Sequence, residues 1–307
     1  MELRTVATPL LDVGYFEAGD SNGPVAVLLH GFPYDAHACV EAGDLLAAEG
    51  WHVLAPWLRG FGPTTFRSPS TVRSGEQAAL GSDLVAFLDA LNVERATFAG
   101  YDWGGRAACV VAALWPERVA GLITAFGYNI FLTEQMIKPG PPDEEANRWF
   151  CFYFHSPRGE AGLRQYTRPL LRQIWEQASP KWRLDDATFD RTATAYENPD
   201  FVSVVIHSYR HRYGMAPGDP QYAELEERLS SRPVIDAPTV VLICDSDGFL
   251  RKEKVEGDDA ISDWRPDTSR FTHLISTTHV DGGHSMTQEN PKEVVAAFRL
   301  LSERVGS

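Results

Sequence analysis

One glycine-bounded segment limits what this chain can fold into more than any other. Residues 99–105 are Ala-Gly-Tyr-Asp-Trp-Gly-Gly, directly after a short β-type run and just before a helical run at 107–114. A sharp turn from strand to helix needs almost side-chain-free residues two positions before and after its tip, and Gly100 and Gly104 supply them. The tip is Asp102, whose carboxylate can attack carbon and form an ester. The segment therefore predicts a turn that presents a nucleophile, with a glycine-rich turn and a capping aspartate as the simpler alternative.

Alternating strand and helix patterns surround this segment. Period-two alternation and short apolar runs predict strands at 11–18, 25–29, 51–55, 95–98, 119–126, 239–243 and 271–276. Helical spacing predicts helices between them, at 37–49, 74–91, 107–114 and 291–301. This alternation predicts an α/β fold with a mostly parallel central sheet and helices on both of its faces.

Residues 128–232 interrupt the alternation. They are rich in Trp, Phe and Tyr, follow helical patterns and contain a proline-rich stretch at 139–142. We interpret this segment as a helical cap laid over the sheet. The predicted domains are therefore a core built from residues 1–127 and 233–307, and a cap built from residues 128–232.

Composition narrows the expected partners and compartment. The net charge of −14 disfavours nucleic acid and anionic membranes as partners. The sequence shows no signal peptide and no apolar run of about 18 residues, so we expect a cytoplasmic protein without a membrane partner. The expected partner is a small-molecule substrate. A homodimer is an open alternative to a monomer.

The cysteines show no metal-ligand spacing. Cys39, Cys109, Cys151 and Cys244 include no Cys-x-x-Cys pair. We interpret them as reduced, mostly buried thiols. Since the sequence has no phosphate-binding loop either, we predict neither a metal nor an organic cofactor.

Three polar residues follow predicted strands in the chain order nucleophile, acid, base. They are Asp102, Asp247 and His284. His284 would deprotonate the water that hydrolyses an ester on Asp102, and Asp247 would orient His284 and stabilise its cation. Asp245 lies in the same turn as Asp247 and is its rival. A solvated loop histidine is the alternative interpretation of His284.

Backbone amides are expected to complete this site as an oxyanion hole. The N–H of Phe32 follows His30-Gly31, and the N–H of Trp103 follows the nucleophile. Together they would hold one carboxylate oxygen of Asp102 and later the tetrahedral intermediate. A strand-terminating turn is the alternative interpretation of residues 30–33.

Four motifs now form a recognisable set: His-Gly-Phe-Pro at 30–33, Arg-Gly-Phe-Gly at 59–62, Gly-Tyr-Asp-Trp-Gly-Gly at 100–105 and Gly-His at 283–284. As a set they resemble the epoxide hydrolase and haloalkane dehalogenase branch of the α/β-hydrolases. The resemblance covers the core and, more weakly, the cap. It implies an α/β-hydrolase fold with a helical cap insertion and an aspartate nucleophile. Tyr101 departs from the family, which usually has His there, and we interpret it as a change in local packing.

The resemblance also implies that two cap tyrosines donate hydrogen bonds to an epoxide oxygen. The sequence around Tyr209 resembles the motif of the second tyrosine, so Tyr209 is the predicted donor. Phe150 stands where the first is expected, which leaves Tyr153 or His155 as a second donor, or a substrate that is not an epoxide. We expect Phe150, Tyr153, His155 and His30 to line the substrate site. Packing of the cap against the core is the alternative for each aromatic residue.

The second activity of this branch needs N–H donors for a departing halide. The resemblance to the haloalkane enzymes implies that the Trp103 indole supplies one and lines the substrate site. Arg106 matches the later of two arginines that hold a substrate carboxylate in fluoroacetate dehalogenases, but Trp103 occupies the earlier position. This argues against a small haloacid, and pairing on the helix is the alternative role of Arg106.

We therefore predict an epoxide hydrolase that opens an apolar or aromatic epoxide to a diol through a covalent ester on Asp102. A haloalkane or haloacid dehalogenase with the same nucleophile is the alternative. A non-catalytic binding protein of this fold is a third hypothesis, against which the complete set of Asp102, Asp247 and His284 argues.

Overall fold

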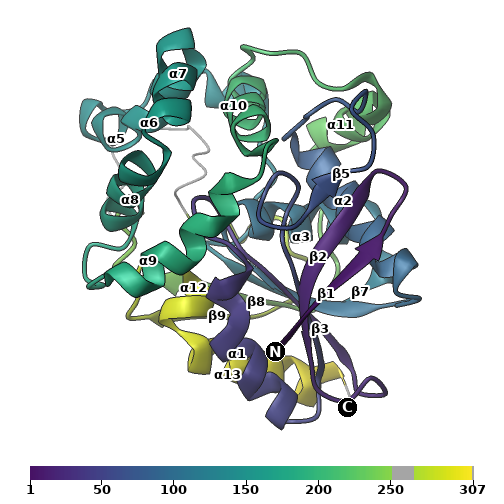
Figure 1. The fold of residues 1–307 in the computed structure, drawn as a ribbon. Helices are drawn as coiled ribbons and strands as arrows, with labels where there is room; N and C mark the ends of the chain where they lie inside the picture. The colour runs from purple at the N-terminus through teal and green to yellow at the C-terminus, as the bar shows by residue number, and fades with distance from the viewer. Residues whose placement is uncertain (251–265, 306–307) are drawn as a thin grey trace.

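The strands build one sheet with helices on both of its faces (Figure 1). The computed structural model describes residues 1–250 and 266–305. Within these residues nine strands form a sheet in the order β1-β2-β4-β3-β6-β7-β8-β9, with β5 beside β2. The strands are β1 (Glu2–Ala7), β2 (Leu11–Ala18), β3 (Val25–Leu29), β4 (His52–Pro56), β5 (Thr65–Phe66), β6 (Ala96–Gly100), β7 (Val119–Ala125), β8 (Thr239–Cys244) and β9 (Leu274–Val280).

Strand direction follows the prediction of a mostly parallel sheet. β2 pairs antiparallel with β1, β4 and β5, whereas all neighbours from β4 to β9 pair in parallel. Every residue of β6 and β8 is buried, because helices cover both faces there. This burial explains why the central strands have continuous apolar runs.

The two edge strands depart from the prediction. The last strand is β9 at 274–280, whereas the apolar pattern predicted 271–276, and β1 was not predicted at all. Among the described residues both strands have a neighbour on one side only, and most of their own residues are exposed or half-buried. Polar residues such as Thr277, Thr278 and His279 are tolerated there, so hydropathy carries little signal.

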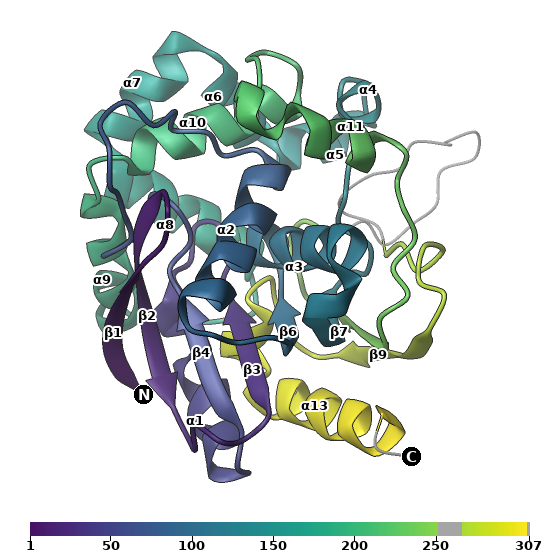
Figure 2. The same ribbon diagram turned by 90° about the vertical axis from the view of Figure 1, so that its right-hand side faces the viewer.

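Helices from distant parts of the chain cover the two faces of the sheet (Figures 1 and 2). One face is covered by helices from the N-terminal and C-terminal parts of the chain. The other face is covered by the two helices that precede and follow β6 in the sequence. On the first face lie α1 (Val40–Ala48), preceded by a 3-10 turn at 36–39, α12 (Met286–Glu289) and α13 (Pro291–Val305). On the second lie α2 (Gln77–Ala90) and α3 (Asp102–Leu114).

Helix α3 begins at the tip of the predicted turn, five residues before the helical run that the sequence pattern predicted. Almost all of its side chains are buried, because α3 contacts β6, β7, α2 and a later helix, α11. Its first turn is made by the glycines and Trp103 of the turn motif, which hydropathy alone does not mark as helical.

A series of short helices lies between β7 and β8 in the sequence. In space these helices form a layer over the carboxyl ends of the parallel strands (Figure 1). We call helices α4 to α11 the helical layer. Residues 128–232, all of which the structure describes, contain helices and turns and no strand. The members are α4 (Thr133–Met136), α5 (Pro142–Asn147), α6 (Trp149–His155), α7 (Pro157–Gln165), α8 (Thr167–Ala178), α9 (Asp186–Ala193), α10 (Phe201–Arg212) and α11 (Ala223–Ser230).

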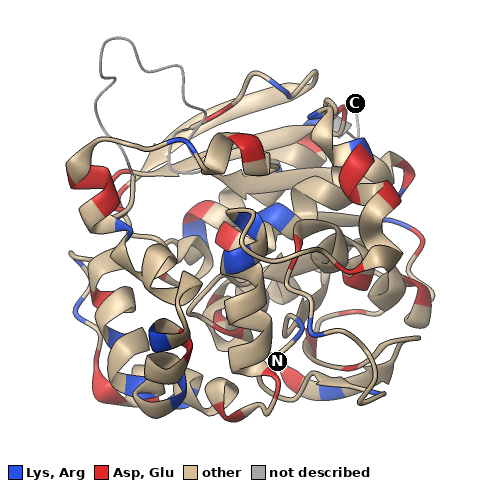
Figure 3. Ribbon diagram, turned by 90° about the horizontal axis from the view of Figure 1, so that it is seen from above, with Lys and Arg blue, Asp and Glu red and all other residues tan. Residues whose placement is uncertain are grey.

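Charged residues of both signs are interleaved along the elements seen from above (Figure 3). Several pair within the helical layer, for example Arg172 with Asp186 and Glu176, and Arg164 with Glu160. Such exposed pairs contribute about 0–1 kcal/mol each, so they set surface character more than stability. In the described residues no helix is both long and apolar enough to cross a membrane.

The glycines of the turn yield a testable difference in stability. A Cβ on Gly104 would lie 2.6 Å from the carbonyl oxygens of His30 and Leu29, whereas one on Gly105 would lie 3.1 Å from the Gly100 oxygen. Both positions are in α3, so alanine brings both the same gain of about 1 kcal/mol in helix propensity. We expect Gly104→Ala to lower the free energy of unfolding by about 1–3 kcal/mol relative to Gly105→Ala, measured by urea denaturation. Equal effects would contradict the contact argument.

Candidate active site

Four predicted site residues meet at one edge of the sheet. Phe32 follows β3, Asp102 follows β6, Asp247 follows β8 and His284 follows β9. These strands run in parallel, so their carboxyl ends, and the loops that follow them, lie on the same side of the sheet. Residues far apart in the sequence are thereby brought together beneath the helical layer.

Asp102 has a strained backbone and a fixed carboxylate. Its φ of 49° lies in the left-handed region, which costs a non-glycine residue about 1–3 kcal/mol. The Phe32 amide donates to Asp102 Oδ1 over 2.7 Å, and Asn129 Nδ2 donates to the Asp102 carbonyl over 2.9 Å. A Cβ on Gly31 would lie 2.6 Å from Asp102 Cβ, so a glycine is needed for this close approach. One carboxylate oxygen is thus held while Oδ2 is left to face His284.

His284 lies between two carboxylates. Its Nδ1 donates to Asp247 Oδ2 over 2.6 Å, and its Nε2 lies 3.9 Å from Asp102 Oδ2. The other oxygen of Asp247 accepts from the Phe249 amide over 2.7 Å. Asp245, the rival in the same turn, instead pairs with exposed His279 at 2.7 Å. The structure therefore brings Asp247, and not Asp245, to the imidazole.

The neighbouring charges determine the protonation of His284. Burial by itself lowers the pKa of this imidazole, but the carboxylates of Asp247, Asp102 and Glu289 outweigh it and raise the pKa to about 9. The surrounding carboxylates therefore favour the protonated form of the His284 imidazole. Loss of the Asp102 charge would remove part of this stabilisation and lower the pKa.

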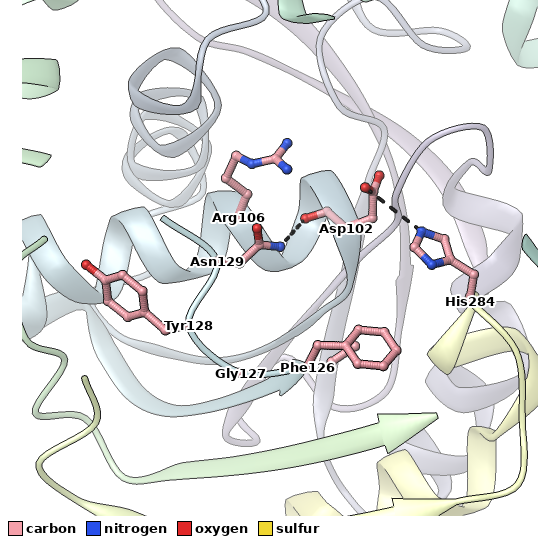
Figure 4. Close-up of a pocket in the computed structure, with 8 residues that line it drawn as sticks. Asp102, Arg106, Phe126, Gly127, Tyr128, Asn129 and His284 are labelled. Carbon is pink, nitrogen blue, oxygen red and sulfur yellow. Dashed lines mark hydrogen bonds and ion pairs between the residues drawn. The ribbon is translucent and has the colours of Figure 1, made fainter. Parts of the chain in front are cut away.

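A small cavity adjoins Asp102 and His284 (Figure 4). Its volume is about 20 Å³, enough for one water molecule. Asp102 lies between His284 on one side and Arg106 and Asn129 on the other. The Oδ1 atom of Asn129 is buried and has no hydrogen-bond partner in the described part of the chain. The lining also includes Ala125, Phe126, Gly127 and Tyr128.

Aromatic side chains cover this site from the side of the helical layer. Phe150 from α6 and Tyr209 from α10 are both buried, with ring centroids 5.8 Å apart. Burial raises the pKa of the Tyr209 phenol well above its usual value, with further contributions from Cys151 and Asp102, so the phenol keeps its proton. We call these rings the aromatic cluster, which consists of Phe32, Trp103, Phe150, Phe154, Tyr209 and Phe249.

The indole of Trp103 is a buried donor within this cluster. The side chain is fully buried, and among the described residues no acceptor lies within hydrogen-bond distance of Nε1. Its backbone N–H is in the first turn of α3, where amides have no partner within the helix. Trp103, which directly follows Asp102, therefore has a buried indole donor and a backbone N–H in the first turn of α3.

His30 has a different environment from the one expected. It is fully buried, its Nε2 accepts from the Leu58 amide over 3.1 Å, and its Nδ1 donates to the Gly31 carbonyl over 3.1 Å. Burial lowers the pKa of His30, consistent with a neutral ring that joins two loops. Both nitrogens are engaged by backbone, so we remove His30 from the predicted substrate-binding set.

Two predicted residues of α6 also face away from Asp102. The Tyr153 hydroxyl fills the place of a side chain on Gly162 of α7, 2.0 Å from where a Cβ would be. The His155 ring packs against Tyr213, with centroids 4.7 Å apart, and burial lowers its pKa. Helical rotation explains this difference, since Phe150 and Phe154 occupy the face of α6 that turns toward the site.

Some residues next to the site were not predicted. Asn129 follows β7, another central strand whose carboxyl end lies at this edge, and its position after a strand could have marked it. Tyr101, interpreted as a packing change, accepts a hydrogen bond from Ser285 Oγ over 2.8 Å, next to His284. No sequence spacing indicates that contact, because it joins residues 184 positions apart.

The cysteines and the possible metal ligands form neither a disulfide nor a metal cluster in the part of the chain that the structure describes. All four cysteines are buried and free of disulfides, as the sequence indicated. In residues 1–250 and 266–305, no group of three His, Cys, Asp or Glu side chains is arranged to hold a metal. Arg106 is buried, and its guanidinium lies 4.4 Å from the centroid of the Phe131 ring.

Comparisons with known proteins match this fold. A family model described as the alpha/beta hydrolase fold matches residues 24–256. A Klebsiella pneumoniae protein of known crystal structure, provisionally named an epoxide hydrolase, is 39% identical with a TM-score of 0.91, covering 98% of this chain and 97% of that one. Epoxide hydrolase A of Mycobacterium tuberculosis is 32% identical over 163 residues, or 47% of this chain and 50% of that protein. Epoxide hydrolase 3 of Siraitia grosvenorii is 35% identical over 148 residues, or 42% of this chain and 46% of that protein. The chain thus spans about half the length of these two curated relatives.

The choice between the two acidic residues can be tested through the imidazole. We expect Asp247→Asn to lower the pKa of His284 from about 9, because it removes the negative charge 2.6 Å from Nδ1. Asp245→Asn is the matched control, since this exposed carboxylate pairs with His279, and it is expected to leave the pKa unchanged. NMR titration of the imidazole nitrogens measures both. A larger shift for Asp245→Asn would reverse the assignment.

Proposed function

The chain belongs to the α/β-hydrolase fold family, and from that premise we propose that it is an epoxide hydrolase acting through an ester on Asp102. The observation that carries the proposal is the alignment of groups around one carboxylate. The Phe32 amide holds Asp102 Oδ1, while Oδ2 faces a histidine anchored on Asp247. Relatives named epoxide hydrolases support the choice of reaction.

The proposal assigns separate roles to two parts of the chain. Residues 1–127 and 233–307 form the core domain, which carries nucleophile, acid and base. Residues 128–232 form the cap domain, which carries the proton donor and covers the substrate. The apolar surface of the aromatic cluster favours an apolar or aromatic small-molecule epoxide.

In the first step Asp102 Oδ2 attacks an epoxide carbon. The carbon–oxygen bond of the ring breaks, and the ring oxygen takes the proton of Tyr209. Without such a donor the step would release a poorly stabilised alkoxide, so a positioned acid contributes about 10²–10⁴-fold. The product of this step is an ester of Asp102, with Oδ1 still accepting from the Phe32 amide.

In the second step water hydrolyses the ester. His284 Nε2 takes a proton from a water molecule, for which the cavity beside Asp102 has room. The water oxygen attacks the Asp102 carboxyl carbon, and the negative charge that develops on Oδ1 is stabilised by the amides of Phe32 and Trp103. Collapse breaks the bond to the substrate oxygen, which takes the proton from the His284 cation. The proton of the new carboxyl group returns to the Tyr209 phenolate, so the Asp102 carboxylate, the neutral phenol and the diol result.

Ester formation prepares the base for this second step. While Asp102 is charged, its carboxylate helps to raise the pKa of His284 to about 9. The ester is neutral, so the pKa falls when the base is needed. The imidazolium then gives its Nε2 proton to solvent, and the neutral ring is the base that the second step needs.

A dehalogenase is the second candidate, because of one specific observation. The buried Nε1 of Trp103 has no partner in the described residues and could donate to a departing halide. The same ester on Asp102 would form, with the carbon–halogen bond broken instead of the epoxide ring. The two reactions differ in the mass that the protein retains.

The mass of a trapped ester tests the mechanism and separates the two activities. We expect His284→Ala to accumulate an adduct on Asp102, because the base for hydrolysis is lost, and intact-protein mass spectrometry detects it. A gain equal to a whole epoxide indicates ring opening, and a gain equal to a haloalkane minus hydrogen halide indicates dehalogenation. His279→Ala, an exposed histidine, is the control and should trap nothing. A substrate turned over by the wild type but never trapped by His284→Ala would rule out the ester mechanism.

The proton donor is tested by removing single hydroxyl groups. We expect Tyr209→Phe to reduce the rate of ester formation by about 10²–10⁴-fold, because the alkoxide loses its acid. Tyr153→Phe is expected to have little effect, since that hydroxyl lies against Gly162. Stopped-flow fluorescence with styrene oxide measures the step in both variants. A similar loss in both would show that Tyr209 has no special role.

A further inference from the structure

One half-buried carboxylate accepts hydrogen bonds from the residues on both sides of the predicted base. Glu289, the last residue of α12, accepts from the Gly283 amide through Oε2 over 2.7 Å and from the Ser285 amide through Oε1 over 3.2 Å. These two amides flank His284 in the sequence. We call residues 283–285 the base loop.

The amide of His284 itself reaches the same carboxylate through one side chain. It donates to Ser179 Oγ over 3.2 Å, and Ser179 Oγ donates to Glu289 Oε1 over 2.6 Å. A serine hydroxyl has a single proton, so the Tyr34 hydroxyl 3.2 Å away acts as donor to Ser179. Three consecutive amides of the base loop therefore end on Glu289, directly or through Ser179.

Packing leaves the base loop little room to shift. A Cβ on Gly283 would lie 2.7 Å from both Glu289 Oε1 and Ser179 Oγ, so the carboxylate is seated against the loop backbone. On the other side, Ser285 Oγ donates to the Tyr101 hydroxyl over 2.8 Å, and Tyr101 directly precedes Asp102. The loop is thus tied to the nucleophile turn and, through Ser179 at the end of α8, to the helical layer.

Even partial burial of a carboxylate costs free energy, which argues for a role of Glu289 beyond filling space. Burial raises the pKa of Glu289, although the donors from Ser179, Gly283 and Ser285 oppose the rise. Every contact described for its two oxygens comes from an N–H or O–H donor, so the arrangement needs an acceptor at both positions. A glutamine would turn an NH₂ group toward one of these donors and lose part of the network.

We propose that Glu289 is a positioning residue that holds the base loop so that His284 faces the ester on Asp102. The proposal rests on the proposed function, and it assigns Glu289 to the second step only. The hydrogen bond from His284 Nδ1 to Asp247 fixes only one atom of the imidazole, and the ring can still tilt about it. The loop backbone must therefore fix the position of Nε2. A displacement of about 1 Å at such a site costs about 10²-fold in rate. Ester formation does not use His284 as a base, so it does not depend on this clamp.

The two steps can be measured separately in Glu289→Gln. With styrene oxide and rapid quenching, we expect ester formation within about twofold of wild type and ester hydrolysis slowed by about 10–100-fold. The ester should then accumulate to nearly one equivalent, which also shows that the variant is folded. Glu289→Asp, which keeps the charge, should recover part of the hydrolysis rate. Glu293→Gln, an exposed carboxylate on α13, is the matched control and should leave both steps unchanged.

Two results would overturn the proposal. One is hydrolysis at the wild-type rate in Glu289→Gln, and the other is equal slowing of both steps together with a lower melting temperature, as a purely structural role predicts. If the wild type forms no ester, the proposed function fails, and the NMR signal of the His284 Nδ1 proton decides the positioning role by itself. A shifted or broadened signal in Glu289→Gln supports the clamp, whereas an unchanged signal contradicts it.

Discussion

The backbone of Asp102 is the constraint on which the rest of the site depends. Its φ of 49° is unfavourable for a side chain with a Cβ, by about 1–3 kcal/mol. Three features hold it there: the close approach of Gly104 to the end of β3, the hydrogen bond from Asn129 to its carbonyl, and the bond from Phe32 to its carboxylate. The buried helix α3 that follows supplies the packing energy that offsets the strain. The strained turn places the carboxylate beyond the sheet edge, where the Phe32 amide after β3 and the His284 imidazole after β9 reach it.

Electrostatics around His284 connects the two proposed chemical steps. Three carboxylates, Asp247, Asp102 and Glu289, raise the pKa of one buried imidazole. Only Asp102 changes its charge in the proposed cycle, so only its contribution switches. The constant contributions of Asp247 and Glu289 keep the ring oriented in both states. The three carboxylates around His284 therefore have different roles: the charge of Asp102 changes during the proposed cycle, whereas the charges of Asp247 and Glu289 do not.

The helical layer is joined to the sheet by polar contacts as well as by the aromatic cluster. Asp35, fully buried after β3, accepts from His37 and Trp57 in the core and from Thr192 in α9. Ser179 at the end of α8 makes a similar link to Glu289. A carboxylate removed from water, fully as in Asp35 or partly as in Glu289, needs surrounding donors, so these contacts fix how the helical layer sits on the sheet. A movement of the helical layer would therefore shift Ser179 and, through its hydrogen bonds, the base loop.

The sequence by itself determined the parts of this protein that depend on local chain properties. Strand burial on both faces produces apolar runs, and the turn at Asp102 needs glycines at set positions, so the core order and the chain order of Asp102, Asp247 and His284 could be predicted. Only the tertiary structure decided the rest. It paired Asp247 with His284 and Asp245 with His279, turned Phe150 inward and Tyr153 outward, enclosed His30 between two loops, and brought Glu289 to the base loop. These outcomes depend on helix rotation and on contacts between distant segments, and a linear pattern of hydropathy contains neither.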